Sequence, residues 1–308
     1  MNNKGYLQIS FGWLFAIIVG AVIIFLAIYF VTKMINTENT IQSAKTSKEI
    51  GILLNPLETG FESATSTFIR LPEETRIYNE CNNIGKFGTQ GIQTKQKGIG
   101  KKWTEVATEV SFQNKYLFSE AYIQGKTFYI FSKPFEFPFK VADLMYITPA
   151  SENYCFIKKD IPDNIENEIS DLDQANLKLE GTCSEDNIKI CFKDSNCDIY
   201  VNYNVGYVEK QNDKMYFETD ALMYAAIFSD KLTYECQLKR LMQRIEQLSN
   251  LYIDKENLIA LRCDSNLGDD LSILSSSASN LEDSNALNIV YNNAQDLEYQ
   301  NRGNCRLW

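Results

Sequence analysis

The sequence contains no histidine among its 308 residues. Histidine is the usual general base of nucleophilic hydrolases and a frequent ligand of zinc, so its absence excludes Ser-His-Asp and Cys-His pairs and His-ligated zinc together. Two phosphate-binding patterns, G-x-x-x-x-G-K-[ST] and G-x-G-x-x-G, are missing as well. The sequence therefore predicts no catalytic residue, no metal site and no cofactor, and we expect a protein that is not an enzyme.

Positive charge is in short supply. The chain carries 30 Lys and Arg against 40 Asp and Glu, which gives a net charge of -10. General nucleic-acid binding needs a basic face that displaces counterions from phosphates, so we expect no nucleic-acid partner. Hydrophobic residues make up 44% of the chain, with 18 Phe and 17 Tyr, and this composition is typical of a folded body with a sizeable core.

Cysteine is present, but neither a C-x-x-C motif nor an N-x-[ST] sequon occurs. The even number of cysteines, all downstream of the N-terminal apolar stretch, predicts disulfides in an oxidising compartment. Eight buried thiols in a reducing compartment are the alternative, and spacing alone assigns no pairing. The eight residues are Cys81, Cys155, Cys183, Cys191, Cys197, Cys236, Cys263 and Cys305.

Charged side chains are absent from residues 5–32, and residues 11–31 form an unbroken apolar run. As a helix, residues 5–32 would measure about 42 Å, enough to cross a lipid bilayer. The run ends in large residues and not in the small residues of a signal-peptidase site, which favours retention of the segment. Lysines flank it on both sides, but the cysteines and the long following domain favour an inside N-terminus and an outside C-terminal domain.

The first residues also contain a short motif that precedes the apolar helix: Lys4, Gly5, Gln8 and Ser10. This motif resembles the class III signal peptide of archaeal type IV pilins and related filament proteins. The resemblance implies that Lys4 and Gly5 are recognised for cleavage, that Gln8 and Ser10 open the mature chain, and that the helix forms a filament core. The chain departs from the family pattern, because Tyr6 and Leu7 intervene and Gly12 occupies the acidic position.

A second similarity extends this expectation to the C-terminal half. The stretch AIFSDKLTYECQLKRLMQR, together with the apolar opening and a cysteine near the C-terminus, is similar to single-pass surface proteins of archaea. That resemblance implies architecture and location and carries no known activity.

The pattern of residues predicts an α+β fold in four parts. Residues 1–33 form a short tail and a transmembrane helix, and residues 34–60 continue it as a helical stalk that ends near Asn55-Pro56. Residues 61–218 contain short aromatic and β-branched runs that predict an antiparallel β-rich region, with one helix or turn after Pro162. Residues 219–308 form a helical region packed on it.

Two features support the C-terminal helical region. Six apolar residues recur at helical spacing and predict a buried stripe on a helix capped by Ser229: Leu238, Leu241, Met242, Ile245, Leu248 and Tyr252. The segment NALNIVYNNAQDLEYQ predicts another helix. We expect Cys236, Cys263 and Cys305 to link these helices to one another.

The segment from Gly85 to Lys102 has five glycines, five lysines and no acidic residue. This composition favours a flexible basic loop, and its lysines are candidates for contact with anionic glycans, lipid headgroups or an acidic neighbouring subunit. They are Lys86, Lys95, Lys97, Lys101 and Lys102.

Two oxygen-rich segments have some of the spacing of calcium loops but lack the Gly and Glu of an EF-hand, which favours turns over metal binding. They contain Asp194, Asn196 and Asp198, and Asp264, Asn266 and Asp270. An acidic run is interpreted as a solvated face: Asp163, Glu166, Glu168, Asp171 and Asp173.

Together these patterns predict a single-pass protein of the cell membrane that acts by binding or assembly. Its expected partners are the lipid bilayer and other surface proteins or copies of itself. A pilin-like subunit or accessory protein of a surface filament is the first alternative. An extracellular hydrolase that uses paired carboxylates is the second.

Overall fold

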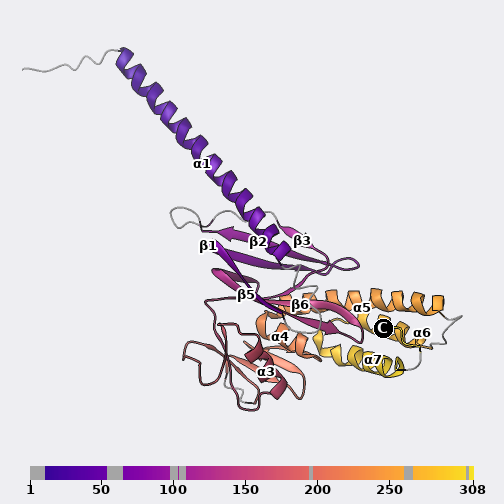
Figure 1. Cartoon of the computed structure of the whole chain (residues 1–308). Coiled ribbons are helices and arrows are strands. Elements are labelled where there is room, and N and C mark those ends of the chain that lie inside the picture. The colour runs from indigo at the N-terminus through magenta and orange to yellow at the C-terminus, as the bar shows by residue number, and fades with distance from the viewer. Residues whose placement is uncertain are drawn as a thin grey trace, which may run out of the picture.

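The computed structural model describes residues 11–53, 65–97, 103, 109–193, 197–259, 266–302 and 305–308. It shows a mixed α+β architecture, as the sequence predicts, with one long N-terminal helix, two six-stranded sheets and a group of C-terminal helices. In Figure 1 the N-terminal helix projects away from a head that contains both sheets and all the other helices.

The projecting helix, α1, runs without a break from Phe11 to Leu53. At 1.5 Å per residue, its 43 residues extend for about 65 Å. It ends just before Asn55-Pro56, where the residue preceding proline is disfavoured in the helical region. Its first part stands free of the head, whereas its last turns pack against β2 and β3.

The first sheet has the strand order β3-β2-β1-β5-β6-β4. Its strands are β1 (Thr65–Asn82), β2 (Thr89–Gln96), β3 (Val110–Phe112), β4 (Tyr116–Phe118), β5 (Tyr122–Glu136) and β6 (Lys140–Pro149). All neighbours pair antiparallel except β4 and β6, which are parallel. The two predicted runs TFIRL and RIYNEC form one long strand, β1, with a register irregularity between Arg70 and Thr75.

The second sheet has the order β12-β11-β10-β9-β7-β8. Its strands are β7 (Tyr154–Phe156), β8 (Leu177–Leu179), β9 (Ile188–Cys191), β10 (Ile199–Asn202), β11 (Tyr207–Lys210) and β12 (Asp213–Tyr216). The prediction of an antiparallel region is wrong here, because β7 pairs parallel with β8 and β9, and β9 pairs parallel with β10. Parallel pairing needs a crossover, which helix α3 (Asp163–Asp171) supplies between β7 and β8.

The C-terminal helices are α4 (Asp220–Phe228), α5 (Lys231–Ile259), α6 (Gly268–Ser279), the short 3₁₀ helix η1 (Ser284–Ala286) and α7 (Leu287–Gln300). The predicted stripe on α5 is confirmed, since four of its members are buried and the other two pack on the same core. The predicted cap is wrong: Asp230, not Ser229, accepts the Thr233 backbone N–H at 2.9 Å and begins α5. The predicted C-terminal helix corresponds to α7, while α6 was not predicted.

Two hydrophobic cores hold the head together. The larger core lies between the first sheet, the second sheet and α3 to α7, and includes Phe131, Tyr146 and Phe228. The smaller core joins the first sheet to the end of α1 through Ile50, which is fully buried against strand residues such as Ile92. The sheet therefore lies between the helical region and the docked end of α1.

Candidate functional site

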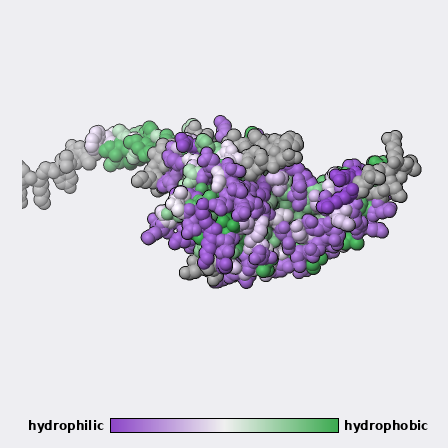
Figure 2. Space-filling model, turned by 60° about the horizontal axis from the view of Figure 1, so that its bottom comes forward, coloured by the Kyte–Doolittle hydropathy of each residue, from purple (hydrophilic) through white to green (hydrophobic). Residues whose placement is uncertain are grey.

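The first functional feature is the apolar part of α1. None of the residues in its most apolar window between Phe11 and Met34 is buried, and the mean hydropathy there is 3.0. Figure 2 shows these hydrophobic residues gathered on the projecting helix, in contrast to the largely hydrophilic head. By length and composition this segment is able to cross a membrane. So large an exposed apolar surface is typical of a segment that meets lipid or another protein.

The second feature is the attachment of α1 to the head. Ser47 Oγ donates a hydrogen bond to Thr94 Oγ1 of β2 at 3.1 Å, and Gln96 Nε2 donates one to Thr46 Oγ1 at 3.0 Å. All four side chains are buried. Gly51 lies so close to Phe112 of β3 that a Cβ atom would come within 2.0 Å of the ring. The apolar segment is thus continuous with a helix that is fixed to the sheet.

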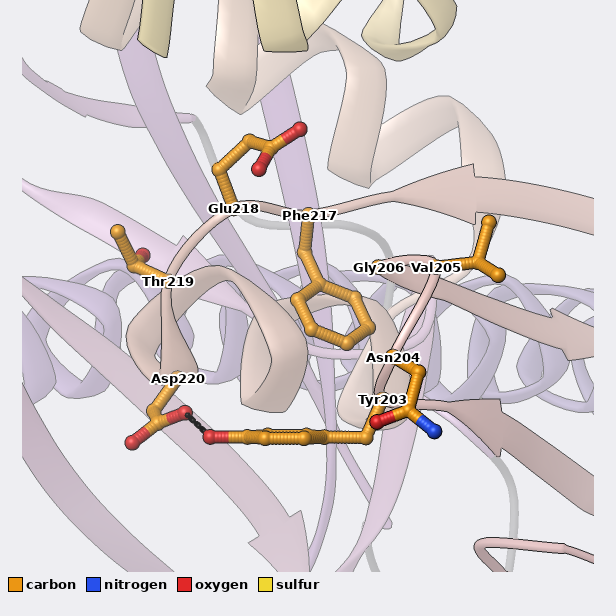
Figure 3. A pocket seen from close by; sticks show the side chains of 8 residues that line it. All are labelled: Tyr203, Asn204, Val205, Gly206, Phe217, Glu218, Thr219 and Asp220. Carbon is orange, nitrogen blue, oxygen red and sulfur yellow. Dashed lines mark hydrogen bonds between the residues drawn. The ribbon is translucent and has the colours of Figure 1, made fainter. Parts of the chain in front are cut away.

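The third feature is a polar cavity of about 180 Å³ beside the start of α4, shown in Figure 3. Asp220 organises it: one carboxylate oxygen accepts the hydroxyl of Tyr203 at 2.8 Å, and the other accepts the amide of Asn164 at 3.0 Å. These residues come from α4, from the turn after β10 and from α3. No sequence pattern predicted this grouping, because the three elements are separate in the chain.

A second cavity of about 330 Å³ lies on the other side of Asp220. Lys133 of β5 donates to both carboxylate oxygens of Glu168 at 2.7 and 2.5 Å, and the Tyr224 hydroxyl donates to the same carboxylate at 3.1 Å. Burial, followed by the negative charge of Glu168, raises the pKa of Tyr224. The predicted solvated acidic face is therefore wrong for Glu168, whose side chain is only 18% exposed.

Carboxylates line both cavities: Glu218 and Asp220 line the first, and Glu168, Asp171 and Asp220 line the second. Glu218 lines the cavity of Figure 3, but its carboxylate points away from that of Asp220. Burial raises the pKa of the Glu218 carboxyl, which has no hydrogen-bond or ion-pair partner among the described residues. Within the described part of the chain, no group of three or more Cys, Asp and Glu side chains is placed to hold a metal ion. The arrangement is suited to hydrogen bonding with a polar ligand.

The predicted basic loop is largely a strand. Residues 89–96 form β2 and pair with β1, with Ile92 opposite Asn79. Alternate side chains of β2 are buried, and this period of two was hidden by the glycines and lysines between them. Lys95 lies within β2, Lys97 follows it and Lys86 precedes it, so the lysines do not share one flexible loop. Lys101 and Lys102 lie outside the described residues.

The other predicted site residues are only partly described. Lys4, Gly5, Gln8 and Ser10, as well as Asp194, Asn196 and Asp264, lie outside the described residues. Asp198 accepts the Lys189 backbone N–H at 2.8 Å, so it links the start of β10 to β9 and does not make a local turn bond. Asp270 lies in the first turn of α6, where a carboxylate stabilises the helix N-terminus.

The cysteines form three described pairs: Cys81–Cys236, Cys155–Cys183 and Cys191–Cys197. Cys305 is also disulfide-bonded, and Cys263 lies outside the described residues. The expectation that Cys236 links the C-terminal helices to one another is wrong, because its partner belongs to β1 of the first sheet. Helical spacing predicted the face of α5 that is buried, but not the strand beside it.

Comparison with known proteins gives no further guide to function. No protein-family model matches the chain, and no curated protein and no solved structure matches it either. Function must therefore be inferred from the residues and their arrangement.

Proposed function

We propose that this is a single-pass, membrane-anchored cell-surface protein that acts by binding or assembly. The observation that carries the proposal is the wholly exposed apolar segment at residues 11–34, in a helix whose far end is fixed to the head. In water such a segment would expose some twenty apolar side chains, at a cost of about 25 cal/mol for each Å². Insertion of the segment into a bilayer removes that cost, and the segment then needs no contact with the head to cover its apolar side chains.

The cysteines support an outside position for the head. Disulfides persist in oxidising compartments and are rare in the cytosol. The head contains three described disulfide pairs, and each lies downstream of the apolar segment. An inside N-terminus and an outside head are the topology consistent with both features.

The anchor is tested by placing charge in the apolar segment. In the variant Val22→Lys/Phe25→Lys, two exposed apolar residues become cations, each costing about 3 kcal/mol at the centre of a membrane helix. We expect the variant to be released from membranes by alkaline carbonate, whereas the native chain stays with the membrane pellet.

The matched control is Ile41→Lys/Ile52→Lys, which alters two exposed residues of the same helix beyond the apolar segment. This variant should remain in the pellet. If the native chain is itself extracted by carbonate, or if both variants behave alike, the anchor assignment is wrong. Native protein should also resist iodoacetamide until it is reduced; full alkylation without reduction would contradict the outside position.

A pilin-like subunit is the second candidate, and the continuity of α1 favours it. A helix that runs unbroken from an apolar half to a half docked on a sheet is also the plan expected for a filament subunit whose apolar helices pack together. The intact mass of membrane-extracted protein separates the two functions. Loss of residues 1–5 supports the pilin-like subunit, and a full-length chain supports the plain anchor.

A further inference from the structure

A row of polar and charged side chains crosses β2, β1 and β5 on the face of the first sheet opposite Ile77 and Ile92. Arg76 of β1 lies directly opposite Lys95 of β2 on one side and Gln124 of β5 on the other. Directly opposite residues in antiparallel strands point to the same face, with Cβ atoms about 5 Å apart. Two cations are therefore held side by side in a chain whose net charge is -10.

Neither cation forms an ion pair among the residues that the structure describes. Arg76 uses Nε to donate to Gln124 Oε1 at 2.7 Å, and its two terminal nitrogens have no acceptor among the described residues. The Lys95 ammonium likewise has no hydrogen-bond or ion-pair partner in the described part of the chain. Hydrogen bonds from Lys97 and Gln124, at 2.5 Å each, together with the nearby charge of Arg76, lower the pKa of the Glu74 carboxyl, whose two oxygens are thus already occupied.

Aromatic rings surround the two cations. The Arg76 guanidinium lies 4.2 Å from the ring centre of Trp103 and 5.8 Å from that of Tyr122. The Lys95 ammonium lies 5.5 Å from the ring centre of Tyr78, which in turn lies beside Tyr122 at 5.9 Å. The contacts with the rings and the bond to Gln124 hold the planar guanidinium in place, and its terminal nitrogens, which have no acceptor among the described residues, are able to bind an anion through two parallel hydrogen bonds.

We propose that this face, defined by Arg76, Lys95, Tyr78, Trp103 and Tyr122, binds acidic sugars of an extracellular polysaccharide. A carboxylate or sulfate group of the sugar would lie between Arg76 and Lys95, relieving the repulsion between them. The apolar face of the sugar ring would lie on Tyr122, which is 55% exposed. Gln93, opposite Tyr78 on the same face, adds an amide for sugar hydroxyls.

An acidic glycan fits this face better than a nucleic acid does. Nucleic-acid binding relies on many phosphate contacts made by a broad basic surface. Here only two cations without an ion pair among the described residues share the face, and Glu74 and Glu80 of the same strand, β1, limit its positive charge. A single acidic group on each sugar, spaced by neutral hydroxyls, matches this limited positive charge. The proposal rests on the outside position of the head given above.

Binding is tested with the full chain in nanodiscs of neutral lipid. The probes are heparin and polygalacturonate, which carry sulfate and carboxylate groups, with neutral dextran and single-stranded DNA as comparisons. We expect both acidic glycans to bind and dextran not to bind. The variant Arg76→Gln/Lys95→Gln should bind the acidic glycans about tenfold more weakly or worse, because it removes both charges at the centre of the face.

The matched control is Lys178→Gln/Lys189→Gln, which makes the same change of charge on the second sheet. It should bind as tightly as the native chain. The variant Arg76→Gln/Lys95→Gln should unfold at a temperature close to that of the native chain, since relief of the repulsion between the two cations offsets the loss of the Arg76–Gln124 hydrogen bond and of the contact with Trp103. Lost binding with a lowered unfolding temperature in Arg76→Gln/Lys95→Gln would instead mark a structural role and overturn the proposal.

The other outcomes are equally decisive. Equal losses in the two double variants would show that overall charge, and not this face, governs binding, and tighter binding of single-stranded DNA would identify a nucleic-acid surface. Both results overturn the proposal, as does the absence of binding to either acidic glycan. Membrane retention is measured separately from glycan binding. A negative glycan result therefore does not contradict the membrane anchor, and a negative anchor result is obtained without any glycan.

Discussion

At the scale of single residues, the head depends on a buried arginine. Arg240 of α5 is fully buried and donates to the backbone carbonyls of Lys115, Gln113 and Phe87 and to the side chain of Gln237. Burial lowers the pKa of Arg240 to about 10, so the guanidinium still carries its charge at neutral pH. It has no ion pair among the described residues and is satisfied instead by neutral oxygens, which fix the segment before β4 against α5.

Replacing this arginine should be costly. In Arg240→Met the side-chain volume is nearly kept, but three backbone carbonyls and one amide oxygen lose their donor, and we expect a loss of about 3 kcal/mol in the free energy of unfolding. Chemical denaturation of the detergent-solubilised chain measures this loss. The exposed Arg302→Met provides the control and should change stability by less than about 0.5 kcal/mol. Similar values for the two variants would show that the buried contacts contribute little.

At the scale of elements, the docking of α1 requires a residue without a side chain. The Cβ of any residue replacing Gly51 would overlap the ring of Phe112, at 2.0 to 2.8 Å. Gly20 lies in the same helix with nothing within 4 Å of such an atom. Replacing each glycine by alanine therefore distinguishes the effect of helical propensity on the stability of α1 from the effect of its packing on the sheet.

Gly51→Ala should destabilise the contact between α1 and β3 by about 1 to 3 kcal/mol, because the added methyl forces the ring or the helix to move. Gly20→Ala lacks this overlap and should be neutral or stabilising, since alanine favours helix over glycine by about 1 kcal/mol. Hydrogen exchange at residues 46–51 reports the difference. Faster exchange in both variants, or in neither, would show that close packing at Gly51 does not hold the helix.

Some elements of this fold are predictable from the sequence alone, and others are not. Helical spacing identified the buried stripe of α5, and alternation of aromatic and β-branched residues identified most strands. Strand direction was not readable, because β7 to β9 have only three or four residues each and their parallel pairing depends on the crossover through α3. The Asp220 cavity and the Arg76–Lys95 pair were missed for a related reason: both depend on which elements become neighbours, which local pattern does not encode.

At the scale of the whole molecule, the disulfides tie distant parts of the chain together to very different extents. Cys81–Cys236 spans 155 residues and joins the first sheet to α5, Cys155–Cys183 spans 28, and Cys191–Cys197 spans 6. A cross-link restricts the unfolded chain more strongly when it closes a longer loop. The first pair therefore restrains the overall fold, while the third restrains only the short connection between β9 and β10.

Removing each pair by double alanine substitution should reproduce this order. The chain-entropy relation gives a loss of about 5 kcal/mol for Cys81–Cys236 and about 2 kcal/mol for Cys191–Cys197, which serves as the matched control. The free energy of unfolding under oxidising conditions, from denaturant titration of the solubilised chain, is the quantity to compare. Equal losses, or a larger loss for the short loop, would show that local packing and not loop length governs the contribution of these bonds.

The unbroken course of α1 has a geometric consequence for the head. The apolar segment ends at Met34 and the docking contacts begin at Thr46, and the chain is helical throughout this interval. The number of residues in the interval therefore sets the direction in which the head faces when it is rotated about the helix axis. One inserted residue would rotate the head by roughly 100° and raise it by about 1.5 Å, whereas seven would restore nearly the original direction. The length of this interval therefore fixes which side of the head, including the Arg76–Lys95 face, is turned toward a neighbouring molecule.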